Sequence, residues 1–225
     1  MFRGFFNADT PFWRWVGSIP SMIGLSLCWY ICCIPIITII PACCALFDAV
    51  SRALMKDNDK GAFQRFFRTF VHELKRGIPL TILWLIIAGL AIFSYLIVAE
   101  NWGVFTIVYV IMLLMLVAYM NWLIPLESRY YNTFLQLHIN AMKLYIGRLP
   151  SSILMLLSTV GVVVVSLINA HTCILLTVAP CLIAVLHTLQ VEKTFKIIFP
   201  QDYEDDLPIY TEQEPIYTKK TETRN

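Results

Sequence analysis

The sequence predicts an all-α membrane protein, a polytopic helical bundle with about five transmembrane helices. Hydrophobic residues make up 58% of its 225 residues and charged residues only 14%, whereas soluble domains carry about a quarter charged residues. The mean hydropathy is +0.69, which is too apolar for a soluble globule. A helix needs about 20 apolar residues to cross the hydrocarbon core, and five uncharged stretches are long enough. The formal net charge of +2 gives no basic field for nucleic acid.

Four of the five predicted spans are plain crossings without a single Asp, Glu, Lys or Arg. They cover residues 78–99, 103–126, 149–170 and 172–191. Together with a first span they place residues 1–199 in one transmembrane domain. The remaining tail, 200–225, is polar and rich in acidic residues and proline, a composition that predicts a disordered cytoplasmic segment.

The first span, at about 15–34, ends in a proline-bounded break. The uncharged interval before Asp48 is too long for one crossing and too short for two. Pro35 and Pro41 interrupt it, because proline lacks a backbone donor and clashes with the preceding turn. We expect a break at the membrane edge that includes Thr38, and a second helix that starts near Pro41. The alternative is a re-entrant segment over residues 35–48.

The distribution of basic residues predicts the orientation. With five crossings, 15 of the 17 Lys and Arg residues fall on one face, and such an excess marks the cytoplasmic side. Only Arg3 and Arg14 fall on the other face. The sequence therefore predicts a multi-pass plasma-membrane protein with a cytoplasmic C-terminus and an N-terminus outside.

An amphipathic helix is predicted in the first basic loop, before the second span. Five apolar residues recur there at offsets of three and four among basic residues, namely Phe63, Phe66, Phe67, Phe70 and Leu74. This pattern is typical of a helix that lies on an anionic membrane surface. The alternative is a docking helix for a cytoplasmic partner.

Polar residues inside the spans are few, and the sequence shows no catalytic motif. Asn121 and His187 are the candidate intramembrane polar residues, and interhelical hydrogen bonds explain them better than ligand binding. No phosphate-binding loop, dinucleotide-binding pattern or nucleophile elbow is present. The seven cysteines lie in apolar stretches and are interpreted as packing residues. We expect no enzyme activity, cofactor or metal.

The break itself carries a family resemblance. Residues 34–42 read Ile-Pro-Ile-Ile-Thr-Ile-Ile-Pro-Ala and are followed by Ala-Leu-Phe at 45–47. This resembles the signature of the YesL-like bacterial membrane family, a domain of unknown function (number 624). Ile40 stands where the family usually has glycine. The aromatic stretch 2–15 and the Phe-rich loop around Phe66 fit the same pattern.

The resemblance implies a bacterial plasma-membrane protein associated with carbohydrate uptake, and two functions follow. The first is an accessory or regulatory protein that binds a partner, such as a sugar-transporter subunit, through the Phe63 to Leu74 helix. The second is a transporter that itself moves a small solute through the bundle. In both cases the lipid bilayer is a partner and nucleic acid is not.

Overall fold

A computed structural model describes residues 19–52, 59–99, 103–130, 133–168 and 173–198. Every regular element in these ranges is helical, which confirms the predicted all-α fold. The predicted tail and the first residues of the predicted first span lie outside the described residues. The helices are α2 (Ile19–Cys33), α3 (Ile39–Arg52), α4 (Asp59–Ala99), α5 (Gly103–Arg129), α6 (Phe134–Gly147), α7 (Leu149–Ile168) and α8 (Cys173–Ile198), with a 3-10 turn η1 at Ile36–Thr38.

Within the described residues, three helices are long and apolar enough to cross a membrane. Their qualifying segments are Gly61–Leu96, Thr106–Arg129 and Leu149–Ser166. Most of their apolar side chains face outward rather than into the protein. Such surfaces suit hydrocarbon and not water, so the chain is suited to membrane insertion with several passes.

The chain reverses direction after helix α2 and returns along it as α3. The 15 described residues of α2 span about 22 Å. Met22 and Leu25, near its start, share a core cluster with Ala49 and Val50 near the end of α3. Helices α2 and α3 therefore lie antiparallel. The predicted break and second helix are present, and the return of α3 along α2 is the arrangement that the re-entrant alternative for residues 35–48 describes.

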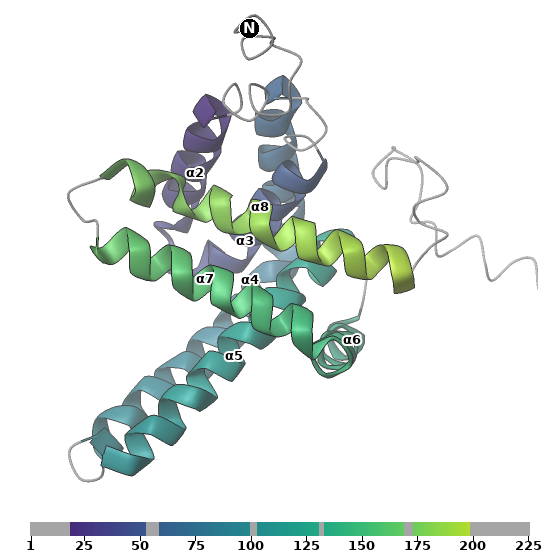
Figure 1. Ribbon diagram of the computed structural model, residues 1–225. Coiled ribbons are helices and arrows are strands. Elements are labelled where there is room, and N and C mark those ends of the chain that lie inside the picture. Colours follow the sequence, from purple (N-terminus) through teal and green to yellow (C-terminus); the bar gives the residue numbers. More distant parts are fainter. Residues whose placement is uncertain (1–18, 53–58, 100–102, 131–132, 169–172, 199–225) are drawn as a thin grey trace, which may run out of the picture.

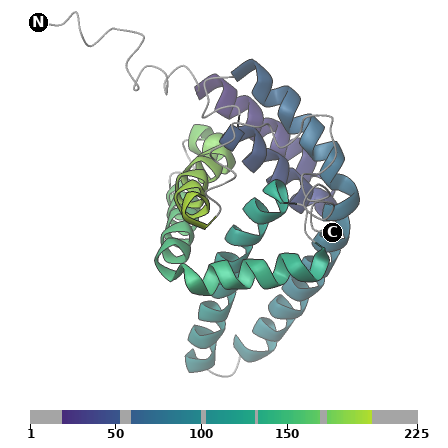
Figure 2. The same cartoon turned by 90° about the vertical axis from the view of Figure 1, so that its right-hand side faces the viewer.

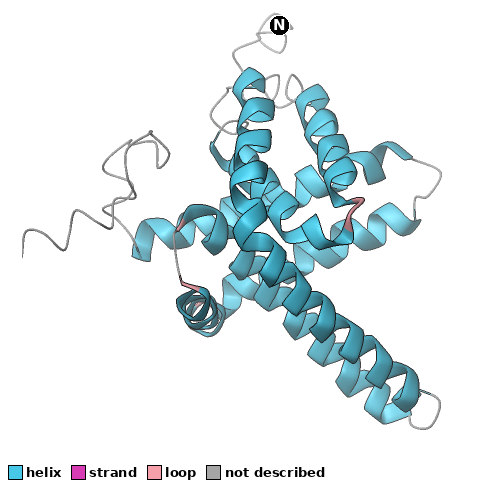
Figure 3. Cartoon of the chain, turned by 180° about the vertical axis from the view of Figure 1, so that it is seen from behind, coloured by secondary structure: helices cyan, strands magenta, loops and turns pink. Residues whose placement is uncertain are grey.

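Helix α4 joins two segments that the sequence analysis separated. The basic Phe-rich stretch and the second span form one helix of 41 residues, with Pro79 inside it. The helix changes direction midway (Figure 3), as expected where proline removes a hydrogen bond from the helical ladder. Beyond the bend, α4 and α5 run together away from the other helices (Figure 1).

Two clusters of buried residues hold the remaining helices together. The first joins α2, α3, α4 and α8, with Phe66 and Cys181 fully buried in it. The second joins α3, α4, α5, α6, α7 and α8 around Trp122, whose indole N–H donates to Ser152 Oγ over 2.8 Å. Helix α6 lies across the ends of α5 and α7 (Figure 2). Cys44 and Cys181 are free thiols in these clusters, as the packing interpretation predicted.

Candidate functional site

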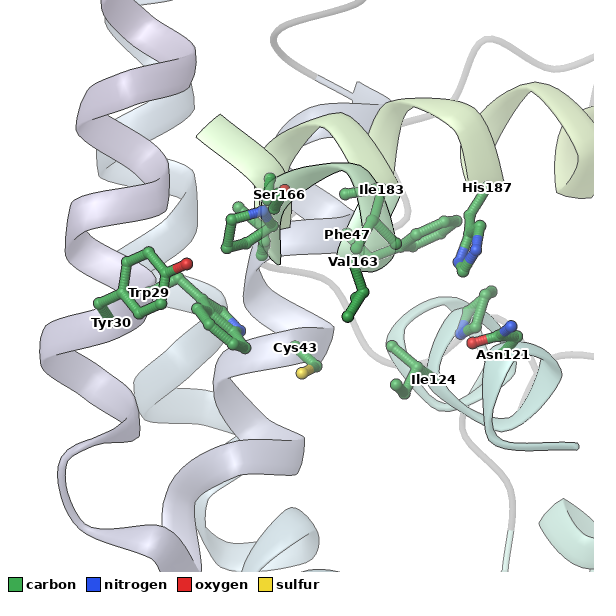
Figure 4. Close-up of a pocket in the computed structure, with 15 residues that line it drawn as sticks. Trp29, Tyr30, Cys43, Phe47, Asn121, Ile124, Val163, Ser166, Ile183 and His187 are labelled. Atoms are coloured by element: carbon green, nitrogen blue, oxygen red, sulfur yellow. The ribbon is translucent and has the colours of Figure 1, made fainter. Parts of the chain in front are cut away.

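A cavity of about 350 Å³ lies between α2, α3, α5, α7 and α8 (Figure 4). Most of its lining is aliphatic or aromatic. Small-molecule sites in proteins are typically cavities of about 300–1,000 Å³ with apolar walls and a few placed polar groups. The cavity therefore has the size and character of a binding site for an apolar ligand.

Asn121 and His187 lie together at one end of the cavity (Figure 4). Asn121 Nδ2 donates to Thr159 Oγ1 over 3.3 Å, and His187 Nε2 lies 3.0 Å from the same oxygen. The Thr159 hydroxyl in turn donates to the Met155 carbonyl over 2.9 Å. Because that hydroxyl has one proton, His187 Nε2 carries a hydrogen and donates to Thr159. These polar groups link α5, α7 and α8, which is the interhelical role that the sequence analysis favoured.

The other end of the cavity is aromatic. Trp29 and Tyr30 of α2 line it, with ring centroids 5.1 Å apart in an edge-to-face arrangement. The Trp29 indole nitrogen faces toward Cys43 and the cavity (Figure 4). That buried N–H has no nitrogen or oxygen partner among the described residues, and the sulfur of Cys43 beside it is only a weak acceptor. An unpaired buried donor is costly, so this end of the cavity offers one hydrogen bond to an occupant.

Buried charged side chains join several of the helices that surround the cavity. Asp48 is fully buried and accepts from Arg65 Nε and Thr69 Oγ1, each over 2.8 Å. Arg52 Nε lies 3.2 Å from its other oxygen. Both oxygens of this carboxylate are therefore paired, which is what a buried charge requires. Through its ion pair with Arg65 and its hydrogen bond with Thr69, Asp48 holds α3 against the first half of α4.

A second group of buried charges is incompletely paired. Glu73 Oε1 lies 3.1 Å from His72 Nδ1, and Glu127 Oε1 lies 3.5 Å from Arg76. Both carboxylates are nearly fully buried, and the second oxygen of each has no hydrogen-bond partner in the described part of the chain. The contact between Arg76 and Glu127 joins α4 to α5.

Arg129, at the end of α5, is a further buried charged residue. Together with Asp48, Glu73 and Glu127 it is called the charged layer. Its guanidinium lies 2.9 Å from Glu192 of α8 and 5.7 Å from the ring centroid of Phe47, a residue that also lines the cavity. Phe195 lies on the guanidinium as well, at 5.5 Å. Cation–π contacts of this kind add to the ion pair in a desolvated site. Arg129 thus lies directly against one wall of the cavity.

The predicted break is present and its three residues have structural roles. Pro35 precedes η1, and the Thr38 hydroxyl lies within hydrogen-bonding reach of the carbonyls of Cys32 and Pro35. Pro41 lies in the first turn of α3, where helical N–H groups have no partner and proline is tolerated. A Cβ on Gly77 of α4 would lie 2.6 Å from Pro41 Cγ. The break therefore packs directly on α4.

The five side chains of the predicted partner helix differ in how far they are buried. Phe66 is fully buried, while Phe63, Phe70 and Leu74 are half-buried. Phe63 closes on Gly24 of α2, and Phe70 stacks on Phe66 with centroids 6.3 Å apart. Only Phe67 is largely exposed among the five predicted residues. Four of the five therefore contribute to the fold itself.

The charged layer and Thr159 did not emerge from the sequence as site residues. One signal was available for Asp48, because Arg65 and Thr69 are four residues apart on one face of a helix. Their pairing with Asp48 depends on the antiparallel packing of α3 and α4. Thr159 is one of many Ser and Thr residues in apolar spans and had no distinguishing spacing.

The family comparison matches residues 22–95 to the family described as "Protein of unknown function, DUF624". The match covers the α2–α3 hairpin and most of α4, including Asp48 and Glu73. It confirms, over this stretch, the resemblance drawn from the break sequence. No curated protein and no solved structure matches the chain.

Proposed function

We propose that the chain is a non-enzymatic accessory or regulatory protein of the plasma membrane, linked to carbohydrate uptake. The link to carbohydrate uptake comes from the family resemblance. The accessory role is supported mainly by one observation, the apolar character of the cavity. A sugar presents a hydroxyl on almost every carbon, and burying hydroxyls without hydrogen-bond partners is costly.

The ion pairs near the cavity also argue against solute transport. A carrier needs a path that continues from its site to both sides of the membrane. Here Arg129 lies against Phe47 at the cavity wall and is paired with Glu192. Asp48, the next residue after Phe47, is buried and paired with Arg52 and Arg65. The alternative, a small-solute transporter, would have to open these ion pairs in each cycle.

The exposed face of the first half of α4 is the surface that we propose for a sugar-transporter subunit. Phe67 and Val71 are one helical turn apart and are 49% and 65% exposed. Arg68 and Lys75 are exposed beside them. An apolar centre flanked by basic side chains suits a partner segment with apolar and acidic residues.

We further propose that the C-terminal tail lies in the cytoplasm. For the N-terminus, the α2–α3 hairpin supports the cytoplasmic side, in place of the outside location that five crossings would give. With a re-entrant hairpin, Arg3 and Arg14 join the other basic residues, so that all 17 fall on one face. The positive-inside rule then holds without exception. A tag before residue 1 that is accessible on intact cells would reject this arrangement.

Affinity capture of the tagged protein from native membranes tests the accessory role. We expect a sugar-transporter subunit to be recovered with the wild-type protein and lost with Phe67→Glu combined with Val71→Glu. Gln64→Glu is the matched control, because it adds a negative charge at an exposed position of the same helix without removing apolar surface. Phe66→Glu is unsuitable, since it would disrupt the core.

Flux measurements test the alternative. Liposomes that contain only this protein should show no uptake of labelled mono- or disaccharides above empty liposomes. Saturable uptake would contradict the accessory role and favour a transporter.

A further inference from the structure

We propose that the cavity binds the acyl chain of a membrane lipid as a specific ligand. The inference goes beyond the proposed accessory role and does not depend on which partner the protein binds. It rests on the walls of the cavity, on the buried indole N–H of Trp29 and on the apolar surroundings of the helices that form it.

The walls exclude most other occupants. Phe47, Ile124, Val163 and Ile183 line the middle of the cavity, and at one end one nitrogen each of Asn121 and His187 is engaged with Thr159. An ordered water needs two to four polar partners, and apolar cavities stay dry and take up apolar molecules. The middle of the cavity has no such partners to offer among its described lining residues. A flexible apolar chain fits these walls.

An acyl chain is the apolar molecule that surrounds this protein in abundance. Val163 lies on α7, and its neighbours Leu157, Val160 and Val164 on the same helix expose their side chains on the protein surface. In a bilayer these exposed side chains contact lipid chains. A chain that enters the cavity from this side would exchange one hydrocarbon environment for another and gain the close contacts of a protein interior.

The Trp29 indole indicates where the polar end of the ligand lies. Its N–H is buried, faces the cavity and has no partner among the described residues stronger than the weakly accepting sulfur of Cys43. The ester or carboxyl oxygen of a lipid can accept this hydrogen bond. Indole and phenol rings prefer the boundary between hydrocarbon and headgroups, and Trp29 and Tyr30 lie together at this end. The chain would then extend from Trp29 toward Asn121.

Photolabelling of the full chain in phosphatidylcholine vesicles tests the proposal. One arm contains a palmitic acid that carries a diazirine, and the other a phosphatidylglycerol with the same acyl diazirine. Peptide mapping should locate label on Phe47 or Ile183, and excess unlabelled palmitate or phosphatidylglycerol should abolish it. Saturable labelling in either arm supports the proposal, and the arm that labels identifies the source of the chain.

Two matched variants separate the cavity from the general lipid surface. Val163→Trp fills the cavity from α7, whereas Val164→Trp adds the same ring at a position with the same 44% exposure that does not line the cavity. We expect loss of cavity labelling for the first variant and retention for the second. Labelling that unlabelled lipid does not reduce in the wild-type protein would overturn the proposal, even if a variant fails to fold. Label confined to outward-facing residues such as Leu157 would overturn it as well.

Discussion

The two halves of α4 are built for different surroundings. The first half, with Phe66, Thr69 and Glu73 buried, is held by other parts of the chain through ion pairs and a packed core. The second half, with Leu90 and Phe93 more than half exposed, contacts little besides α5. One helix therefore takes its stability from protein contacts at one end and from the bilayer at the other. Each prediction below tests this contrast.

The largest effect is expected at Asp48. Replacing it by Asn leaves Arg65 and Arg52 beside a neutral group in a buried site. Breaking a buried ion pair from one side costs about 3–5 kcal/mol. The free energy of unfolding in mild detergent, followed by denaturant titration, should fall by this amount. Lys75→Gln, at an exposed site of α4, should change it by less than about 0.5 kcal/mol. Equal effects of the two variants would contradict the assigned role of Asp48.

Arginine scanning distinguishes the surroundings of the two halves. Leu90 and Val71 are similarly exposed, at 62% and 65%. An arginine near the centre of a span costs about 2.5–3.5 kcal/mol for insertion. Leu90→Arg should therefore reduce the membrane-integrated fraction in a translocation assay, while Val71→Arg should leave it unchanged. A loss of integration with Val71→Arg would place the first half of α4 inside the bilayer.

A glycine pair tests packing in the same helix. A Cβ at Gly77 would lie 2.6 Å from Pro41 Cγ and 3.2 Å from its backbone nitrogen, whereas a Cβ at Gly89 meets nothing within 4 Å. Overpacking costs about 1–3 kcal/mol. Gly77→Ala should thus lower the melting temperature. Gly89→Ala should leave it unchanged or raise it, since alanine favours a helix by about 0.8–1.0 kcal/mol. The account would be contradicted if both variants were stabilised.

The smallest effect is expected at Glu73. Its Oε2 and the Oε2 of Glu127 are buried without partners in the described residues. Burial of these two carboxylates therefore already costs free energy in the wild-type protein, because the lost hydration is not fully replaced. Glu73→Gln removes one charge and leaves Arg76 with Glu127. The free energy of unfolding should stay within about 1 kcal/mol of wild type or rise. A loss as large as that of Asp48→Asn would mean that Glu73 has a partner outside the described residues.

The sequence was sufficient for the helices but not for their contacts. The absence of charge over 78–99, 103–126 and 149–170 predicted helices that the structure confirms, because hydrocarbon excludes ionised groups along a whole span. Pro35 and Pro41 predicted the break because proline acts locally. Such features depend on composition and on neighbours in the sequence.

Contacts between distant residues could not be predicted in this way. Asp48 lies 17 residues from Arg65 and 21 from Thr69, and they meet only because α3 and α4 pack side by side. The amphipathic pattern did not reveal that Phe66 is buried and Phe67 exposed, since it does not say which face another helix covers. Asn121 and His187 were predicted as polar candidates, but their meeting at Thr159 depends on three packed helices.

The most direct test of the contrast within α4 is a pair of tags on either side of it. One tag is inserted at residue 57, before α4, and the other at residue 101, between α4 and α5. On intact cells, labelling with an impermeant reagent should reach the tag at 101 and miss the tag at 57 until the membrane is permeabilised. Both tags on one side of the membrane would contradict the account, because the second half of α4 would then not cross the bilayer.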